Sequence, residues 1–477
     1  MDSLSREVVK IFSSLSSQQQ QQQQQQPLQG KRTTQDDAFS RESVARLKQT
    51  ISNPNTSTAT MKDNMVKLIY GEMMGYPVQF GAIYALKLAQ SGQTVAEKRA
   101  GYVACSLLLL DGNELNIMLV NTLQKDLSSS NYHHVIVALI TLCSMTLTDV
   151  IPALVTPVLQ VFSHPQETVR KRAVIALKRF YIQLPEMVLP YLNQLKDALR
   201  DPEPSVMSAA LGLFAEIVKD HAEDNKDLVP ILIRILKQVV EGRLPKGYMY
   251  HGMPAPWIQV RCLHLMALLG FNDLSASKAM TPVVMAAFHR AAQGVDAAFA
   301  VLFEVIKTLN TFHPDIILEL VQSTDPHTNP LLVISRFATS ANPNLRYLGM
   351  ALLDQVLPQA WCDTWWTDSL LTAVVESLDS RDASLQRRTL DLLFRLLTRE
   401  NSLNIIERLT VALHSTEDPL QRDKLLGQIL RGSEAFGQSE EWYVDSVFAL
   451  LASQNPAVTL HAAELVINVL ERGKIKW

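Results

Sequence analysis

The stretch that decides the fold is His164-Pro-Gln-Glu-Thr-Val-Arg-Lys-Arg-Ala173, which has a counterpart in Asp201-Pro-Glu-Pro-Ser-Val-Met-Ser-Ala-Ala210. In both stretches a turn with proline leads into a helical pattern rich in alanine and leucine, and the valine returns after 37 residues. Related turns recur at Ala96-Glu-Lys-Arg-Ala100, Pro343-Asn-Leu-Arg346, Ala383-Ser-Leu-Gln-Arg-Arg388, Asp418-Pro-Leu-Gln-Arg422 and Pro456-Ala-Val458. A period of about 37 residues with two helices in each repeat indicates a stack of helix pairs.

The helical period continues outside these turns. From Met61 onward, apolar residues recur at spacings of three and four, as in Met65, Leu68 and Ile69. No sustained alternation bounded by hairpin signals interrupts them. Because one helix pair alone leaves an apolar face uncovered, each repeat has to stack on its neighbours. We therefore predict an all-α fold, a HEAT/armadillo-type α-solenoid of stacked helix pairs.

Two departures from the period define the domain organisation. Nine consecutive glutamines, Gln18–Gln26, have no apolar face to bury, so we predict a mobile Gln-rich segment over residues 1–35. The solenoid is expected to fill residues 36–477. The repeat period is interrupted once, because Val206 and Val260 are 54 residues apart and not 37. We expect an inserted loop near residues 241–256, in which His251 serves either loop packing or polar recognition.

Composition argues against several classes of protein. The chain has 44 basic and 47 acidic residues, a formal net charge of −3, whereas nucleic-acid-binding domains are strongly basic. Its 18 glycines are few for the strand-to-helix turns of a doubly wound nucleotide-binding enzyme. The four cysteines lack metal-ligand spacing and indicate buried, reduced thiols. No signal peptide opens the chain and no apolar run approaches ~20 residues, so we expect a soluble cytosolic protein.

The common signatures of catalysis are also missing. The sequence contains no nucleophile elbow, zinc-protease helix motif, phosphate-binding loop or dinucleotide-binding fingerprint. We therefore predict that the chain is not an enzyme, needs no cofactor and binds no metal. A repeat array without a catalytic cluster presents large surfaces for protein binding. The basic step Arg170–Arg172, with Lys178 and Arg179, has two interpretations: it contacts phosphates, or it forms ion-paired rungs between repeats.

A family resemblance rests on two parts of the chain. The segment Met65-Val-Lys-Leu-Ile-Tyr-Gly-Glu-Met-Met-Gly-Tyr-Pro-Val-Gln-Phe-Gly81 resembles the opening repeats of adaptins, the large subunits of heterotetrameric adaptor protein complexes. The stretches Leu236–Pro245 and Tyr250–Gln259 are more similar to the epsilon class of the fourth adaptor complex than to gamma- or alpha-type adaptins. The resemblance is to the adaptin N-terminal trunk, and we expect no hinge or ear after Trp477.

The resemblance implies a function and a set of partners. It implies a large-subunit scaffold that assembles with beta-, mu- and sigma-type adaptin subunits. It further implies peripheral recruitment to trans-Golgi network membranes by an Arf-family GTPase. Transmembrane cargo would be sorted by cytosolic signals into non-clathrin vesicles. The alternatives are a gamma- or alpha-type clathrin adaptor large subunit and another helical-repeat transport scaffold, coatomer-like or importin-like.

The resemblance also suggests candidate binding residues. For the GTPase, the first repeats offer three apolar residues, Leu88, Val103 and Leu107, whose alternative role is packing between repeats. For cargo or phosphoinositide, the candidates are the basic residues Arg6, Lys10, Arg41 and Lys62. Of the basic run that binds phosphoinositide in alpha-type adaptins, Lys62 alone remains here.

Overall fold

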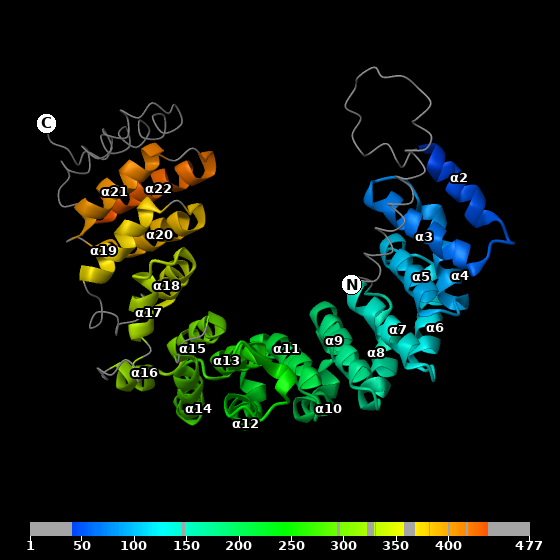
Figure 1. The fold of residues 1–477 in the computed structure, drawn as a ribbon, viewed down its shortest axis with the longest axis horizontal. Helices are drawn as coiled ribbons and strands as arrows, with labels where there is room; N and C mark the ends of the chain where they lie inside the picture. Colours follow the sequence, from blue (N-terminus) through cyan, green and yellow to red (C-terminus); the bar gives the residue numbers. More distant parts are fainter. Residues whose placement is uncertain are drawn as a thin grey trace, which may run out of the picture. The chain divides into compact units, whose positions relative to one another are not determined.

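The computed structural model describes residues 41–145, 148–292, 296–321, 329, 331–356, 368–380, 382–398, 401–415 and 418–436. The expected Gln-rich segment lies outside the described residues. The chain divides into two compact units between His221 and Ala222. Both are built from helices, which confirms the predicted all-α solenoid class (Figure 1). Within the described residues, no helix combines the length and the apolar character needed to cross a lipid bilayer.

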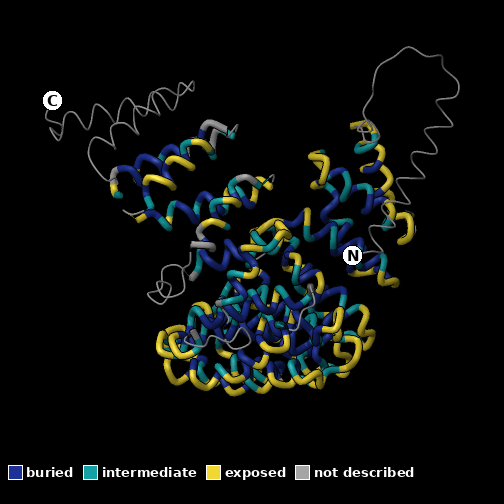
Figure 2. The backbone as a smooth tube through the Cα atoms, turned by 60° about the vertical axis from the view of Figure 1, so that its left-hand side comes forward, coloured by how far each residue is buried: buried dark blue, intermediate teal, exposed yellow. Residues whose placement is uncertain are grey.

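The first unit consists of stacked helix pairs. Its helices are α2 (Arg41–Ser52), α3 (Thr58–Met73), α4 (Ala82–Ser91), α5 (Val95–Leu108), α6 (Leu115–Leu127), α7 (Tyr132–Ser144), α8 (Ile151–Gln160), α9 (Glu167–Gln183), α10 (Leu192–Lys196) and α11 (Pro204–Asp220). Helices α3, α5, α7, α9 and α11 pack in sequence as one layer, while α4, α6 and α8 form a second layer against it. Buried apolar residues lie between the layers. Exposed residues alternate with buried ones along the helices and also occupy many of the connections (Figure 2).

Local sequence sets the helix starts and the close packing of this unit. Helix α5 begins with a capping box, since the Thr94 hydroxyl accepts a hydrogen bond from the Glu97 amide and the Glu97 carboxylate accepts one from the Thr94 amide. Gly101 lets α5 approach α4 closely, because a Cβ atom there would lie 2.5 Å from the backbone nitrogen of Ala89. The pair α4–α5 therefore packs backbone against backbone.

The second unit repeats the same plan. Its helices are α12 (Val229–Val240), α13 (Pro256–Leu269), α14 (Leu274–Ala292), α15 (Phe299–Thr311), α16 (Pro314–Val321), α17 (Leu331–Ala338), α18 (Pro343–Val356), α19 (Asp368–Glu376), α20 (Ala383–Arg395), α21 (Ser402–Ser415) and α22 (Pro419–Phe436). Helices α13, α15, α18, α20 and α22 pack in sequence as one layer. In the second layer α12 packs on α14 and α14 on α16.

The segment between α12 and α13 contains no α-helix but includes a 3-10 turn at Lys246–Tyr248. It contains the strands β1 (Met249–Tyr250) and β2 (Met253–Pro254), which pair antiparallel with Tyr250 opposite Met253. The two residues between them, His251 and Gly252, have φ angles of 45° and 82°. Positive φ at both central positions is the geometry that a two-residue hairpin turn needs.

Candidate partner-binding surfaces

A buried polar cluster joins three helices of the first unit. The Lys98 ammonium of α5 donates to both carboxylate oxygens of Asp126 on α6, at 2.9 and 2.8 Å, and to the carbonyl of Ala89 on α4, at 3.0 Å. The Tyr102 hydroxyl donates to the same carboxylate at 2.6 Å. Burial and the neighbouring Asp126 charge raise the pKa of Tyr102 far above its usual value, so its proton stays in the hydrogen bond. This cluster holds neighbouring repeats together and presents no charge to a partner.

The three apolar GTPase candidates occupy different environments. Leu88 of α4 is 2% exposed and packs in the core, whereas Leu107 of α5 is 39% exposed. Val103, one turn before Leu107, is half-buried. A partner has to reach a side chain to bind it, so the structure does not offer Leu88 as a surface anchor. The surface candidates are Leu107 and, in part, Val103.

Further apolar side chains are exposed near Leu107, around the connection from α5 to α6. We call Leu107, Leu110, Ile117 and Met118 the α5–α6 edge patch; Ile117, at 73% exposed, is the most open of the four. The connection is fixed locally, because the side-chain amide of Asn116 donates to the Leu110 carbonyl at 2.9 Å. Sequence reasoning missed Leu110, Ile117 and Met118, because an apolar residue next to a helix connection carries no signal in the sequence that separates an exposed position from a buried one. Four exposed apolar side chains around one connection are a candidate binding surface.

The basic candidates are less closely grouped. Arg41 lies exposed at the start of α2, and Lys62 lies in the second turn of α3 with its ammonium 3.4 Å from the Asp63 carboxylate. Helices α2 and α3 pack together, so both cations belong to the same end of the first unit. Arg6 and Lys10 fall outside the described residues, and their role stays a prediction.

Two basic residues of α9, Arg170 and Lys178, form ion pairs with acidic residues of the next repeat. Arg170 donates to both oxygens of Asp201, at 2.7 and 3.0 Å, and to the carbonyls of His164 and Pro165. Lys178 of the same helix lies 3.0 Å from Glu216 on α11. These two cations therefore tie one repeat to the next.

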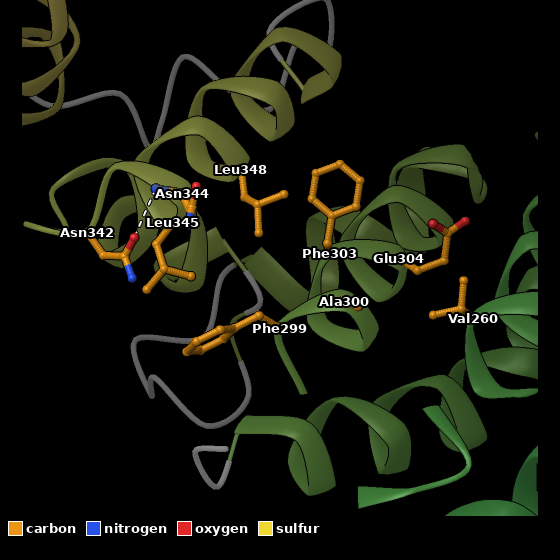
Figure 3. A pocket seen from close by; sticks show the side chains of 9 residues that line it. All are labelled: Val260, Phe299, Ala300, Phe303, Glu304, Asn342, Asn344, Leu345 and Leu348. Carbon is orange, nitrogen blue, oxygen red and sulfur yellow. Dashed lines mark hydrogen bonds between the residues drawn. The ribbon is translucent and has the colours of Figure 1, made fainter. Parts of the chain in front are cut away.

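The second unit contains a cavity of about 580 Å³ between α13, α15 and α18 (Figure 3). It is lined by Val260, Phe299, Ala300, Phe303, Glu304, Asn342, Asn344, Leu345 and Leu348. Burial alone would raise the pKa of the Glu304 carboxyl, but hydrogen bonding by His264 and the charge of Lys307 outweigh burial and lower it. Glu304 is thus ionised and already paired, and the remaining lining favours apolar groups.

The hairpin at residues 249–254 supports a group of aromatic rings. The Trp257 ring, in the first turn of α13, lies 6.4 Å from the ring of Tyr248 and 6.4 Å from that of Tyr250. The Tyr250 ring also meets His251 edge-on at 4.5 Å. Tyr250 is 51% exposed and Trp257 is 41% exposed. The described residues contain no cluster of His, Cys, Asp and Glu that would hold a metal ion.

Comparison with known proteins places the chain among adaptins. Residues 37–474 match the adaptin N-terminal region. The chain is 34% identical over 418 residues to AP-4 complex subunit epsilon-1 of Mus musculus, with 88% of this chain and 36% of that protein covered. It is 31% identical over 448 residues to AP-4 complex subunit epsilon of Arabidopsis thaliana, with 93% and 46% covered. The chain therefore spans less than half the length of these two relatives.

Two structures share the fold at low sequence identity. A homology model of the full-length AP-3 complex contains a chain that matches 87% of this chain with a TM-score of 0.55 and 19% identity, and 73% of that chain is covered. A structure of Kap95p with RanGDP contains one that matches 98% of this chain with a TM-score of 0.56 and 12% identity, and 58% of it is covered. Both matches support the helical-repeat architecture.

Proposed function

Since this chain belongs to the adaptin N-terminal region family, we propose that it is the large-subunit scaffold of a heterotetrameric adaptor complex in vesicle-mediated intracellular protein transport. The observation that carries the proposal is the family match over residues 37–474, together with 34% identity to an AP-4 epsilon subunit. Its direct partners are beta-, mu- and sigma-type adaptin subunits. Its activity is binding and not catalysis, which accords with an architecture of stacked helices that presents extended surfaces.

The proposal includes recruitment by a GTP-loaded Arf-family GTPase to trans-Golgi membranes. The α5–α6 edge patch is the surface that supports this step, because its apolar centre is exposed in the first unit. Binding anchors at protein interfaces are apolar groups that lose water on contact, surrounded by a polar rim. Asp111 and Asn113, in the connection beside the patch, supply polar groups at its rim.

Cargo and lipid contacts form the remaining part of the proposal. Arg41 and Lys62 place two cations at the start of the first unit, where an anionic headgroup or an acidic cargo signal would find opposite charge. Because Lys62 also lies near Asp63, its attraction for an anion is weaker than that of an unpaired lysine. Sorting of transmembrane cargo into non-clathrin vesicles completes the proposal, and the likeness to epsilon subunits is what supports it.

Affinity purification tests the assembly. The tagged chain, expressed in cells at native level, is isolated from a Golgi-enriched lysate, and the associated chains are identified by mass spectrometry. We expect one beta-, one mu- and one sigma-type adaptin in equal amounts. Recovery of the chain without any adaptin subunit would overturn the proposal.

A second experiment tests the GTPase surface. Ile117→Glu is introduced into the assembled complex, and binding of the complex to membranes carrying a GTP-loaded Arf-family GTPase is measured. We expect a loss of at least about tenfold, because a charge replaces an apolar anchor. Leu274→Glu is the matched control, since Leu274 is an exposed leucine of the second unit. Unchanged recruitment by Ile117→Glu, with helix content and sigma binding intact, would place the GTPase elsewhere.

A further inference from the structure

The aromatic group on the second unit has the composition of a binding site. We define the aromatic hairpin surface as Tyr248, Tyr250 and Trp257 with the cations around them. Trp, Tyr and Arg are the residues most enriched among those that dominate binding energy at interfaces. The rings pack in tilted and edge-on arrangements, which leave ring faces open to solvent. Tyr250 and Trp257 are accordingly exposed. A single exposed aromatic residue is ordinary on a protein surface. A group of three, with the Trp257 ring 6.4 Å from each tyrosine ring, indicates a binding surface.

The backbone holds these rings in a fixed arrangement. Ala255 adopts a left-handed conformation, with φ 36° and ψ 63°, directly before α13 begins at Pro256. Left-handed backbone costs a non-glycine residue about 1 kcal/mol or more and persists where the surroundings impose it. Here the Ala255 amide donates to the Tyr248 carbonyl at 2.7 Å, and the buried Gln259 side chain donates to the Pro254 carbonyl at 2.7 Å. A surface with fixed rings loses little conformational freedom when it binds.

The charged residues that flank the rings in the sequence, from position 241 to position 261, are mainly positive. Arg261 is exposed one helical turn after Trp257 on α13, so both lie on the same face of the helix. Lys246 is exposed at the start of the segment that leads to Tyr248. Glu241 is the acidic residue between positions 241 and 261, and it is paired with Arg243 at 2.8 Å. Opposite charge therefore favours an anionic partner.

The size and shape of the surface indicate the kind of partner. It consists of three rings and the nearby charged residues of one hairpin and the start of α13, whereas each side of a stable interface between folded proteins contains about 20–30 residues. A loop that enters a lipid bilayer would carry apolar residues at its tip, but the tip here is His251-Gly252 and the following Met253 is buried. We infer that the aromatic hairpin surface docks an acidic linear peptide segment of a partner protein, whose aromatic side chain stacks on Tyr250 and Trp257 while its carboxylates face Lys246.

Peptide binding to the assembled complex, or to the full chain, tests the inference. The probes are fluorescent peptides in which one Phe, Tyr or Trp is flanked by Asp and Glu residues, read by fluorescence anisotropy. The same peptides with Lys in place of each acidic residue are the charge control. We expect saturable binding of the acidic set that weakens as salt is added. Tyr250→Ala should weaken peptide binding about tenfold. Lys246→Glu, as a separate variant, should also weaken peptide binding, and its effect should be larger at low salt.

Two control variants and one alternative ligand make the test decisive. Phe271→Ala removes an exposed aromatic ring at another connection, and Lys278→Glu reverses an exposed charge on α14; both should leave peptide binding unchanged. Vesicles of phosphatidylcholine with phosphatidylserine serve as the lipid probe. No binding of any acidic peptide, equal binding of the charge control, or vesicle binding that depends on Tyr250 would overturn the inference. None of these results depends on recovery of adaptin subunits, so this inference and the proposed function fail separately.

Discussion

The ammonium group of Lys98 lies 2.8 Å from the carboxylate of Asp126, and both side chains are almost wholly buried. The two residues belong to α5 and α6, so their contact crosses from one helix pair to the next. A buried charge is tolerated where a partner and further hydrogen bonds replace its water, and here Tyr102 and the Ala89 carbonyl complete the set. The contact therefore fixes the geometry of the first repeats.

Removing the cation alone should be costly. Lys98→Met leaves Asp126 buried without its counter-charge, and we expect the free energy of unfolding to fall by about 3–5 kcal/mol, as for other broken buried pairs. Urea unfolding followed by circular dichroism gives the value. Lys125→Met, on the exposed face of α6, is the matched control and should change stability by less than about 0.5 kcal/mol. Equal effects of the two substitutions would mean that Lys98 is hydrated in solution.

Close backbone approach predicts a second pair of sensitive positions. A Cβ atom at Gly101 would lie 2.5 Å from the Ala89 nitrogen, and one at Gly349 would lie 2.5 Å from the Ala338 nitrogen. Backbone cannot yield as a side-chain end can, so Gly101→Ala and Gly349→Ala should each destabilise their unit by about 1–3 kcal/mol. Gly247→Ala meets nothing within 4 Å and should be tolerated. Thermal unfolding of the three variants distinguishes these cases.

Acid should weaken the start of α14 through one carboxylate. The Ala276 amide and the Lys226 ammonium donate to Asp273 and lower its pKa below 3.8. A lowered folded-state pKa means that Asp273 adds stability above the unfolded value of 3.8, and that this stability is lost as the pH falls through the folded value. Asp273→Asn should therefore be less stable than wild type at neutral pH, and the difference should shrink as the pH falls below 3.8 through the lowered folded-state pKa of Asp273. A constant difference across a series of urea titrations at pH 2–7 would contradict this assignment.

The repeat was readable from the sequence because equivalent residues meet equivalent surroundings. Val169 of α9 and Val206 of α11 both lie in the core, so selection of an apolar residue at each period leaves a regular trace. The ion pair between Arg170 and Asp201 also connects equivalent parts of the repeat, since Asp201 is the first residue of the next copy of the turn. The buried valines and the ion pair between repeats were thus predictable from residue spacing and charge.

Exposure at the ends of a repeat was not predictable in the same way. Leu88 and Leu107 each follow an alanine by three residues, and only the packing of α4 against α5 and α6 separates the buried leucine from the exposed one. The aromatic hairpin was flagged by a break in the period, but the ring positions depend on left-handed backbone at His251 and Ala255, which no composition rule specifies.

The contrast between Leu88 and Leu107 gives the last prediction. Leu88→Glu places a carboxylate in the core between helix layers, where it has no partner, and we expect a loss of several kcal/mol or failure to fold. Leu107→Glu places the same group where water reaches it, so the free energy of unfolding should change by about 1 kcal/mol or less. Circular dichroism and urea unfolding of the two variant chains measure the difference. If Leu88→Glu folds as well as Leu107→Glu does, α4 is not packed as the structure has it, and Leu88 returns as a candidate contact for the GTPase.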